Sequence, residues 1–141
     1  MTIHQATDLI KQCAEHMNAR YKKPVFDEWA IVSVQDRPRR LLAYIGPRRE
    51  NFQRDFLADA GPLRVGLLTE KCQVGDFEFA RHGVRTGFDS FMSLGKGLIL
   101  ICNNTVQSMD GITQDPLWLA AQVPFVDLGE RFRSDPVALS V

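Results

Sequence analysis

The segment from Phe88 to Gly111 constrains the fold of this 141-residue chain more than any other part of the sequence. A strand-like stretch ends at the turn Gly95-Lys96-Gly97, the apolar run Leu98-Ile99-Leu100-Ile101-Cys102 follows, and the polar corner Asn103-Asn104-Thr105 comes next. A short apolar run between turn signals is typical of a fully buried strand. The segment therefore predicts a hairpin whose second strand lies at the centre of a sheet, and the asparagines predict a turn after it.

Size, composition and charge exclude several classes of protein. The chain is 45% hydrophobic and 24% charged with a formal net charge of zero, and its length suits one domain. No apolar stretch approaches the roughly 20 residues of a membrane helix, and the N-terminal residues lack the pattern of a signal peptide. Zero net charge argues against a nucleic-acid binder. We therefore expect one cytoplasmic domain over residues 1–141 that contacts neither membranes nor nucleic acids.

Cysteine usage points away from disulfide, metal and thiol chemistry. Cys13, Cys72 and Cys102 are odd in number, widely spaced and form no Cys-x-x-Cys pair. Cys102 ends the apolar run, where burial makes a thiol inert. A cysteine enzyme would need a base and an acid beside it, for which the candidates are His16, His82 and Asp110. We expect no catalytic residue, no metal and no cofactor.

Apolar residues at spacings of three and four predict three helices. The first is capped by Thr7-Asp8 and ends before Pro24, and the second runs from Phe52 to Glu70 with Gly61-Pro62 interrupting it. The third starts at Asp115-Pro116, a favourable cap and first-turn pair, and ends at Asp135-Pro136. Because an interior proline removes a helical hydrogen bond, we expect the last helix to bend or break at Pro124.

Five segments rich in β-branched or aromatic residues predict strands. The first two form an antiparallel hairpin across a polar, proline-containing break, and the third alternates apolar and polar residues as a half-exposed strand does. The segments are residues 29–34, 41–45, 77–81, 88–94 and 98–103.

This order of elements, helix, two strands, interrupted helix, three strands and helix, resembles the roadblock family. The resemblance covers nearly the whole chain and is strongest over residues 76–133, where Asp76-Phe77-Glu78-Phe79 and the hairpin precede the last helix as in bacterial members. Leu41 to Ile45, followed by Gly46, is similar to the second strand of that family. The resemblance implies the α/β class, specifically an α+β sandwich of the roadblock-like or profilin-like type, with a five-stranded, mostly antiparallel sheet in a single roadblock-like domain.

The resemblance also implies a function without catalysis. Family members pair through their second strand and second helix into homodimers with a continuous sheet, and act as platforms for small Ras-like GTPases or signalling complexes. We therefore expect a homodimeric adaptor or regulatory module. The chain departs from the family in its second helix, which carries charged residues where the family has small ones: Arg48, Arg49, Glu50, Arg54 and Asp55.

The expected self-association surface combines the second strand with the start of the second helix. Its apolar members are Leu41, Ala43, Ile45, Phe52 and Phe56, and its charged margin is Arg39, Arg40, Arg48 and Arg49. Two alternatives for the arginines stay open. They can protect a sheet edge from unwanted pairing, or they can bind an anion or an acidic partner where the second helix begins.

Two further functions stay open as alternatives. A profilin-like or PAS-like sensory domain would enclose a small ligand among the aromatic residues, in a cavity with a few polar groups. A secretion-chaperone-like protein would have a similar order of elements, although such proteins tend to be acidic and this chain is neutral.

Overall fold

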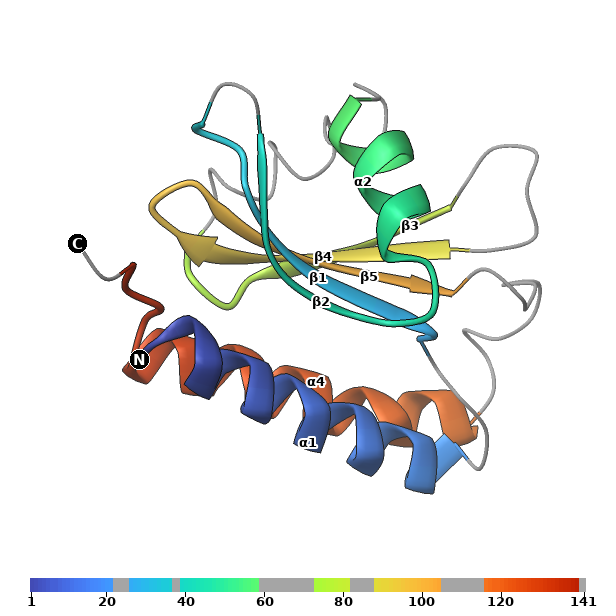
Figure 1. Cartoon of the computed structure of the whole chain (residues 1–141). Coiled ribbons are helices and arrows are strands. Elements are labelled where there is room, and N and C mark those ends of the chain that lie inside the picture. Colours follow the sequence, from blue (N-terminus) through green and yellow to red (C-terminus); the bar gives the residue numbers. More distant parts are fainter. Residues whose placement is uncertain (22–25, 37–38, 59–72, 82–87, 105–115, 140–141) are drawn as a thin grey trace.

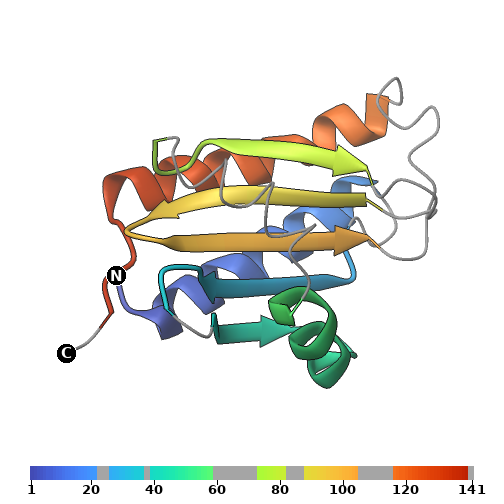
Figure 2. The same ribbon diagram turned by 90° about the horizontal axis from the view of Figure 1, so that it is seen from above.

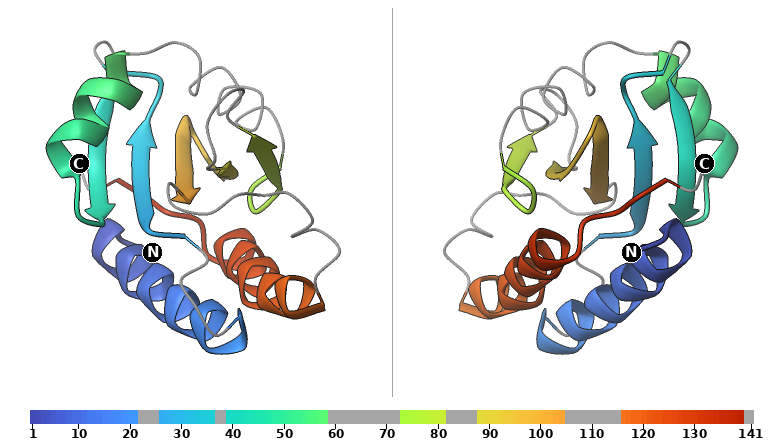
Figure 3. Two further views of the ribbon diagram at one scale, coloured as in Figure 1. Left: turned by 90° about the vertical axis from the view of Figure 1, so that its right-hand side faces the viewer. Right: turned by 90° about the vertical axis from the view of Figure 1, so that its left-hand side faces the viewer.

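The computed structural model is an α+β fold, which confirms the predicted mixture of helices with an antiparallel sheet (Figure 1). It describes residues 1–21, 26–36, 39–58, 73–81, 88–104 and 116–139. Helices α1 (Ile3–Tyr21) and α4 (Pro116–Ser134) lie side by side on one face of the sheet, and α2 (Arg49–Ala58) lies on the other face (Figures 1 and 3). The described elements therefore form three layers with the sheet in the middle.

The sheet contains five strands, each antiparallel to its neighbours (Figure 2). Their spatial order is β2-β1-β5-β4-β3, so β2 and β3 form the two edges. The strands are β1 (Glu28–Ser33), β2 (Arg40–Ile45), β3 (Phe77–Arg81), β4 (Phe88–Gly95) and β5 (Leu98–Asn104).

Strand β5 lies in the middle of the sheet, as the apolar run predicts. All five residues of Leu98–Cys102 are at most 1% exposed. The turn that precedes them has positive φ angles at both central residues, 54° at Lys96 and 75° at Gly97, as a type I′ hairpin turn requires. This turn matches the right-handed twist of the strands that it joins, and β4 pairs with β5 over nearly its whole length.

Asn103 lies in a strand, as the strand predicted over residues 98–103 requires, whereas the turn predicted at Asn103-Asn104 is not found. Asn103 and Asn104 are strand residues rather than turn residues, and Thr105 lies outside the described residues. Asn103 pairs with Glu28 of β1 and is fully buried. Its side chain finds a hydrogen-bond partner on the neighbouring strand, so the local preference of asparagine for turns does not decide its conformation.

Helix α1 begins earlier than predicted, because Thr2 rather than Thr7-Asp8 is its cap. The Gln5 amide donates to Thr2 Oγ1 at 3.1 Å, and the Thr2 amide donates to Gln5 Oε1 at 2.8 Å. This reciprocal pair is a capping box, which satisfies two otherwise unpaired amides. Thr7 is an interior residue whose hydroxyl donates to the Ile3 carbonyl.

Of the bend or break expected at Pro124, the break does not occur, because helix α4 is continuous through this residue. A proline lacks the amide that would bond the carbonyl four residues earlier, here that of Ala120. Arg20 of α1 donates to that carbonyl instead. None of the described helices has an apolar stretch long enough to cross a lipid bilayer.

Apolar residues fill both faces of the sheet. The larger cluster lies between the sheet and the pair α1 and α4, and includes Ile10, Met17, Trp29, Phe125 and Phe132. The smaller cluster lies on the α2 face, where Phe52 packs with residues of the central strands. The predicted interruption of the second helix at Gly61-Pro62 lies outside the described residues.

A tight turn before β3 is fastened to α4. Arg133 of α4 donates to the Val74 carbonyl at 2.9 Å and to the Asp76 carboxylate at 3.1 Å. Gly75 has a φ of +90° and lies so close to Gly129 that a Cβ on either residue would meet the backbone of the other. Glycine is required at this contact both for conformation and for space.

Candidate functional site

Strand β2 is the edge on which the sequence places the self-association surface. It pairs with β1 on one side only, and all its residues after Arg40 are half-buried. Leu42 has no partner residue on β1, because the register shifts between Ile31 and Val32. A bulge of this kind increases the local twist of an edge strand. The outer edge of β2 is therefore short and twisted, and its backbone amides and carbonyls can pair with a strand of another chain.

The apolar residues predicted for this surface divide between the two faces of the sheet. Ala43 and Ile45 pack against the cluster under α1 and α4, whereas Leu41 packs against the cluster under α2. Phe52 is 2% exposed and its ring lies 5.5 Å from that of Tyr44. It therefore packs beneath β2 as a core residue and is not part of an exposed surface. The side chain of Phe56 lies outside the described residues.

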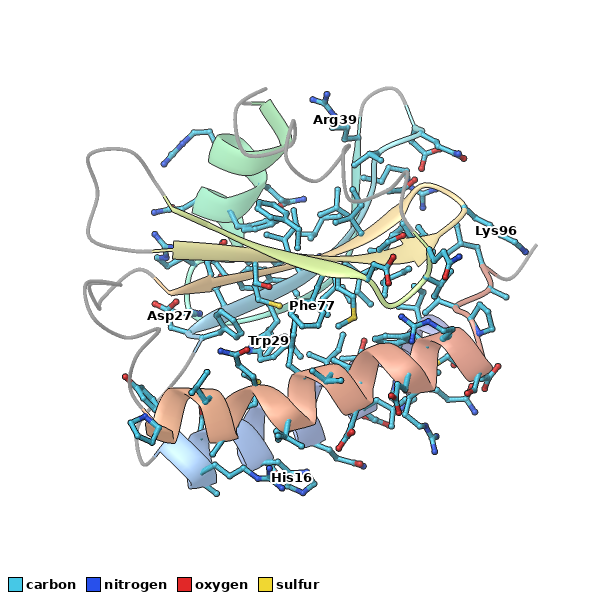
Figure 4. All side chains as sticks on the ribbon, turned by 180° about the vertical axis from the view of Figure 1, so that it is seen from behind. His16, Asp27, Trp29, Arg39, Phe77 and Lys96 are labelled. Atoms are coloured by element: carbon cyan, nitrogen blue, oxygen red, sulfur yellow. The ribbon has the colours of Figure 1, made fainter. Side chains whose placement is uncertain are left out.

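The four predicted arginines lie at the two ends of β2. Arg39 and Arg40 are at its start. Arg39 lies on the side of the sheet away from α1 and α4 (Figure 4). Arg40 is 3.7 Å from the Asp36 carboxylate, and Arg39 Nε is buried without a hydrogen-bond partner among the described residues. Arg49 is exposed in the first turn of α2.

Arg48, whose side chain is 39% exposed, is paired with a carboxylate of the chain itself. Its Nη2 donates to Oε1 of Glu28 at 3.1 Å, and Glu28 is fully buried. The positive charge of Arg48 is therefore balanced inside the chain. Arg40 and Arg49 are exposed at opposite ends of β2, so among the described residues the predicted arginines form a charged border of the β2 edge.

A buried polar cluster at the end of β2 was missed by sequence reasoning. It consists of Glu28, Tyr44, Arg48 and Asn103, which we call the Glu28 cluster. Asn103 Nδ2 donates to Glu28 Oε1 at 2.7 Å, and the Tyr44 hydroxyl donates to Glu28 Oε2. The Arg48 amide in turn donates to the Tyr44 hydroxyl at 3.0 Å. The cluster thus joins β1, β2, β5 and the start of α2.

The surroundings of Tyr44 in the Glu28 cluster keep its hydroxyl protonated. Burial and the hydrogen bond to Glu28 raise the pKa of Tyr44 above its ordinary value of 10.0. The hydroxyl is therefore a proton donor to the carboxylate throughout the neutral range. No group in the Glu28 cluster is an activated nucleophile, because the tyrosine is neutral and the carboxylate is paired with the arginine. We therefore infer that the cluster holds β2 and α2 in position and does not carry out a reaction.

The two cysteines within the described residues are both buried. Burial, and to a smaller extent the nearby charge of Asp127, raises the pKa of Cys13 to about 12. Cys102 is fully buried, and His16, one of its suggested bases, lies on the outer side of α1, away from the sheet (Figure 4). His82, Asp110 and Cys72 lie outside the described residues, and within the described part no three metal-ligating side chains gather.

Within the described residues, several aromatic side chains pack on one another. The Phe125 ring lies 4.9 Å from that of Phe77 and 5.9 Å from that of Phe26, whose ring is in turn 5.2 Å from that of Trp29. Trp29 and Phe77 both extend from the sheet toward α4 (Figure 4). The groove between Thr7 of α1 and Ala43 of β2 is too narrow to hold a water molecule. This packing does not favour the small-ligand sensory alternative.

Comparison of the chain with protein-family models, with curated proteins and with solved structures gave no match.

Proposed function

We propose that this chain is a non-catalytic adaptor of the roadblock-like type that works by protein contact and forms a homodimer through β2 and α2. The main observation in support of this proposal is that β2 is an edge strand with α2 beside it. A strand with one unpaired side is a template for pairing with another chain. The three layers, with α1 and α4 on one face and α2 on the other, support the finer roadblock-like description of the fold (Figure 3).

The Glu28 cluster supports this proposal because it fixes the contact surface. Arg48 and Tyr44 lie at the junction of β2 and α2, and both bond the buried Glu28 of β1. An edge strand held in one conformation loses less entropy when a second chain pairs with it. Partners beyond the second copy would be a small Ras-like GTPase or another signalling protein, which a non-catalytic platform would hold.

Sedimentation or light scattering tests the proposal through the mass of the full chain. We expect twice the 16.0 kDa of one chain at micromolar concentration. Ile45→Asp places a charge on β2 and should give a monomer, because a carboxylate at a paired edge lies among apolar groups. A wild-type mass of one chain over the whole concentration range would contradict the proposal.

Ile45 also packs against the core, so a second variant is needed. Arg49 is exposed, and Arg49→Glu should leave the fold intact, as circular dichroism can verify, while it weakens self-association. The matched control is Glu130→Lys, an exposed charge reversal on α4 at the other side of the sheet, which should leave the mass unchanged.

A further inference from the structure

Helix α2 begins at a residue that the sheet holds at two points. Arg48 directly precedes α2, and its carbonyl accepts the first helical hydrogen bond, from the Phe52 amide at 2.8 Å. Its own amide donates to the Tyr44 hydroxyl at 3.0 Å, and its Nη2 donates to Oε1 of Glu28 at 3.1 Å. Tyr44 bonds the other oxygen of Glu28. Both contacts of Arg48 therefore lead to one buried carboxylate, and we call them the Arg48 latch.

Helix α2 depends on this attachment because it has little stability of its own. Helices are usually capped by serine, threonine, aspartate or asparagine, whose side-chain oxygens accept hydrogen bonds from the first amides. An arginine side chain has only donors, so Arg48 cannot cap α2 in this way. With ten residues, α2 is also shorter than the roughly 12–15 residues at which an isolated helix becomes marginally stable.

The described side chains of α2 bury little apolar surface. Among those of Arg49–Arg54, only Phe52 is buried, and it packs in the smaller apolar cluster with Ala30, Val32 and Ile101. Helices α1 and α4 lie on the other face of the sheet (Figure 3), where they bury five and four of their described side chains in the larger cluster. Within the described residues, α2 is therefore attached to the sheet less firmly than α1 and α4 are.

The Glu28 cluster is also not fully satisfied. Arg48 Nε and Asn103 Oδ1 are both buried without a hydrogen-bond partner among the described residues. A buried polar atom without a partner costs free energy, which is recovered when water reaches it. Movement of Arg48 away from the sheet would return its Nε to water and open the cluster around Asn103. The closed position of α2 therefore has a cost that opening removes.

We propose that α2 opens from the sheet as one unit, which breaks the Arg48 latch, while the sheet and the pair α1 and α4 stay folded. Local opening of this kind occurs where a segment has few buried apolar contacts. It would uncover the apolar face on which Phe52 packs, including Val32 and Ile101. Because α2 belongs to the proposed contact surface, opening would also regulate self-association, and this consequence alone rests on the proposed function.

Native-state hydrogen exchange of the full chain, at urea concentrations below the unfolding transition, tests this inference. Amides of α2 should exchange at least about tenfold faster than those of β5 and α4. Their exchange should also depend less on urea, because local opening exposes less surface than unfolding does. All proteins are measured at one concentration, so that the comparison does not depend on self-association.

Two variants show whether opening breaks the Arg48 latch. Glu28→Gln removes the charge that holds Arg48 and should speed exchange of α2 by about tenfold or more, the effect of losing a charge-assisted hydrogen bond. Tyr44→Phe keeps the ring beside Phe52 but removes the hydroxyl that holds the Arg48 amide, and should speed it by about fivefold or more. The second change is small enough to leave the fold intact.

A variant on the other face of the sheet shows whether the opening is local. Ile10→Val in the larger cluster should speed exchange of β5 and α4 by about threefold or more, the effect of one lost methyl group. It should leave α2 unchanged, because the closed and the open forms both contain the intact α1 layer. The matched control for Glu28→Gln is Glu130→Gln, at an exposed acid of α4, which should change neither group of amides.

Three results would overturn the inference. In the first, α2 exchanges at the same rate and with the same urea dependence as β5 and α4. In the second, Ile10→Val speeds exchange of α2 as much as that of α4, so that α2 unfolds only with the whole chain. In the third, Glu28→Gln and Tyr44→Phe leave α2 unchanged, so that opening does not break the latch. A monomeric wild type with fast exchange of α2 would contradict the homodimer alone, so the two proposals fail separately.

Discussion

Arg20 Nη1 of α1 donates a hydrogen bond of 3.3 Å to the Ala120 carbonyl of α4. This is the carbonyl that Pro124 leaves without its helical donor, since proline has no amide hydrogen. A side chain of α1 thus supplies the hydrogen bond that α4 lacks at Pro124. The contact explains how α4 passes through an interior proline without ending there.

A double-mutant cycle on this contact tests that explanation. Arg20→Met should lower the free energy of unfolding by about 1 kcal/mol, the usual net value of one hydrogen bond. In a Pro124→Ala background the new amide can donate to the Ala120 carbonyl. Arg20→Met should then lower the free energy of unfolding by clearly less than it does in the wild type. Urea denaturation measures all four proteins, and Arg131→Met provides a control at an exposed arginine of α4. Equal costs of Arg20→Met in both backgrounds would show that the bond is not coupled to the proline.

The Glu28 cluster predicts that a single substitution at its central residue strongly lowers the free energy of unfolding. Glu28→Leu removes the acceptor of Tyr44, Arg48 and Asn103 at once and leaves their donors unpaired around an apolar residue. We expect a loss of about 2–4 kcal/mol in the free energy of unfolding, because the fully buried Asn103 amide loses its partner without regaining water, and the half-buried Tyr44 and Arg48 regain it only in part.

The matched change for Glu28→Leu is Glu50→Leu, at an exposed acid of α2. Exposed substitutions of this kind usually change the free energy of unfolding by less than about 0.5 kcal/mol. Denaturant titrations followed by tryptophan fluorescence measure both variants. A Glu28→Leu protein as stable as the wild type would mean that the cluster contributes nothing to holding β2 and α2 together.

Local patterns were sufficient for much of the fold. The apolar run Leu98–Cys102 predicts a buried strand because it is short and bounded by turn signals, and the structure buries it in β5. The absence of a break at Pro124 could not be predicted locally, because the compensating donor, Arg20, is about a hundred residues away in sequence. The cap of α1 was misplaced because Thr7-Asp8 and Thr2 both suit a helix start, and only the reciprocal bond with Gln5 distinguishes them.

The contacts of the candidate site were harder to predict. Glu28 and Asn103 are 75 residues apart, and their contact depends on the register between β1 and β5. A one-residue change of register would turn one of the two side chains to the other face of the sheet. The sequence does contain a signal, an acid at the start of a strand otherwise rich in apolar residues, but it does not identify the partner.

Cys13 predicts a loss of stability at alkaline pH. In the unfolded chain its thiol ionises near its ordinary pKa of 9.0, whereas in the folded chain the pKa is raised to about 12. The stabilisation is complete below pH 9 and decreases as the pH rises above it, because only the unfolded chain then loses the proton. The slope from this group is about 1.4 kcal/mol per pH unit.

Urea denaturation at several pH values between 8 and about 11 measures that slope. Cys13→Ala removes the titrating group, so its free energy of unfolding should decrease less steeply than that of the wild type. Other alkaline groups titrate in both proteins and cancel in the comparison. Parallel curves for the two proteins would contradict a buried, protonated Cys13.

The contact between Gly75 and Gly129 predicts that a normally favourable substitution is unfavourable here. Replacing glycine by alanine inside a helix usually stabilises it by up to about 1 kcal/mol. At Gly129 the new Cβ would lie 2.6 Å from the Gly75 carbonyl oxygen, a backbone atom that Arg133 and Asp76 help to hold in place. Gly129→Ala should therefore lower the free energy of unfolding by about 1–3 kcal/mol, the cost of overpacking. Thermal and urea denaturation measure the change, with Gln12→Ala on the exposed side of α1 as control, and a Gly129→Ala protein more stable than the wild type would show that the turn and α4 can separate without cost.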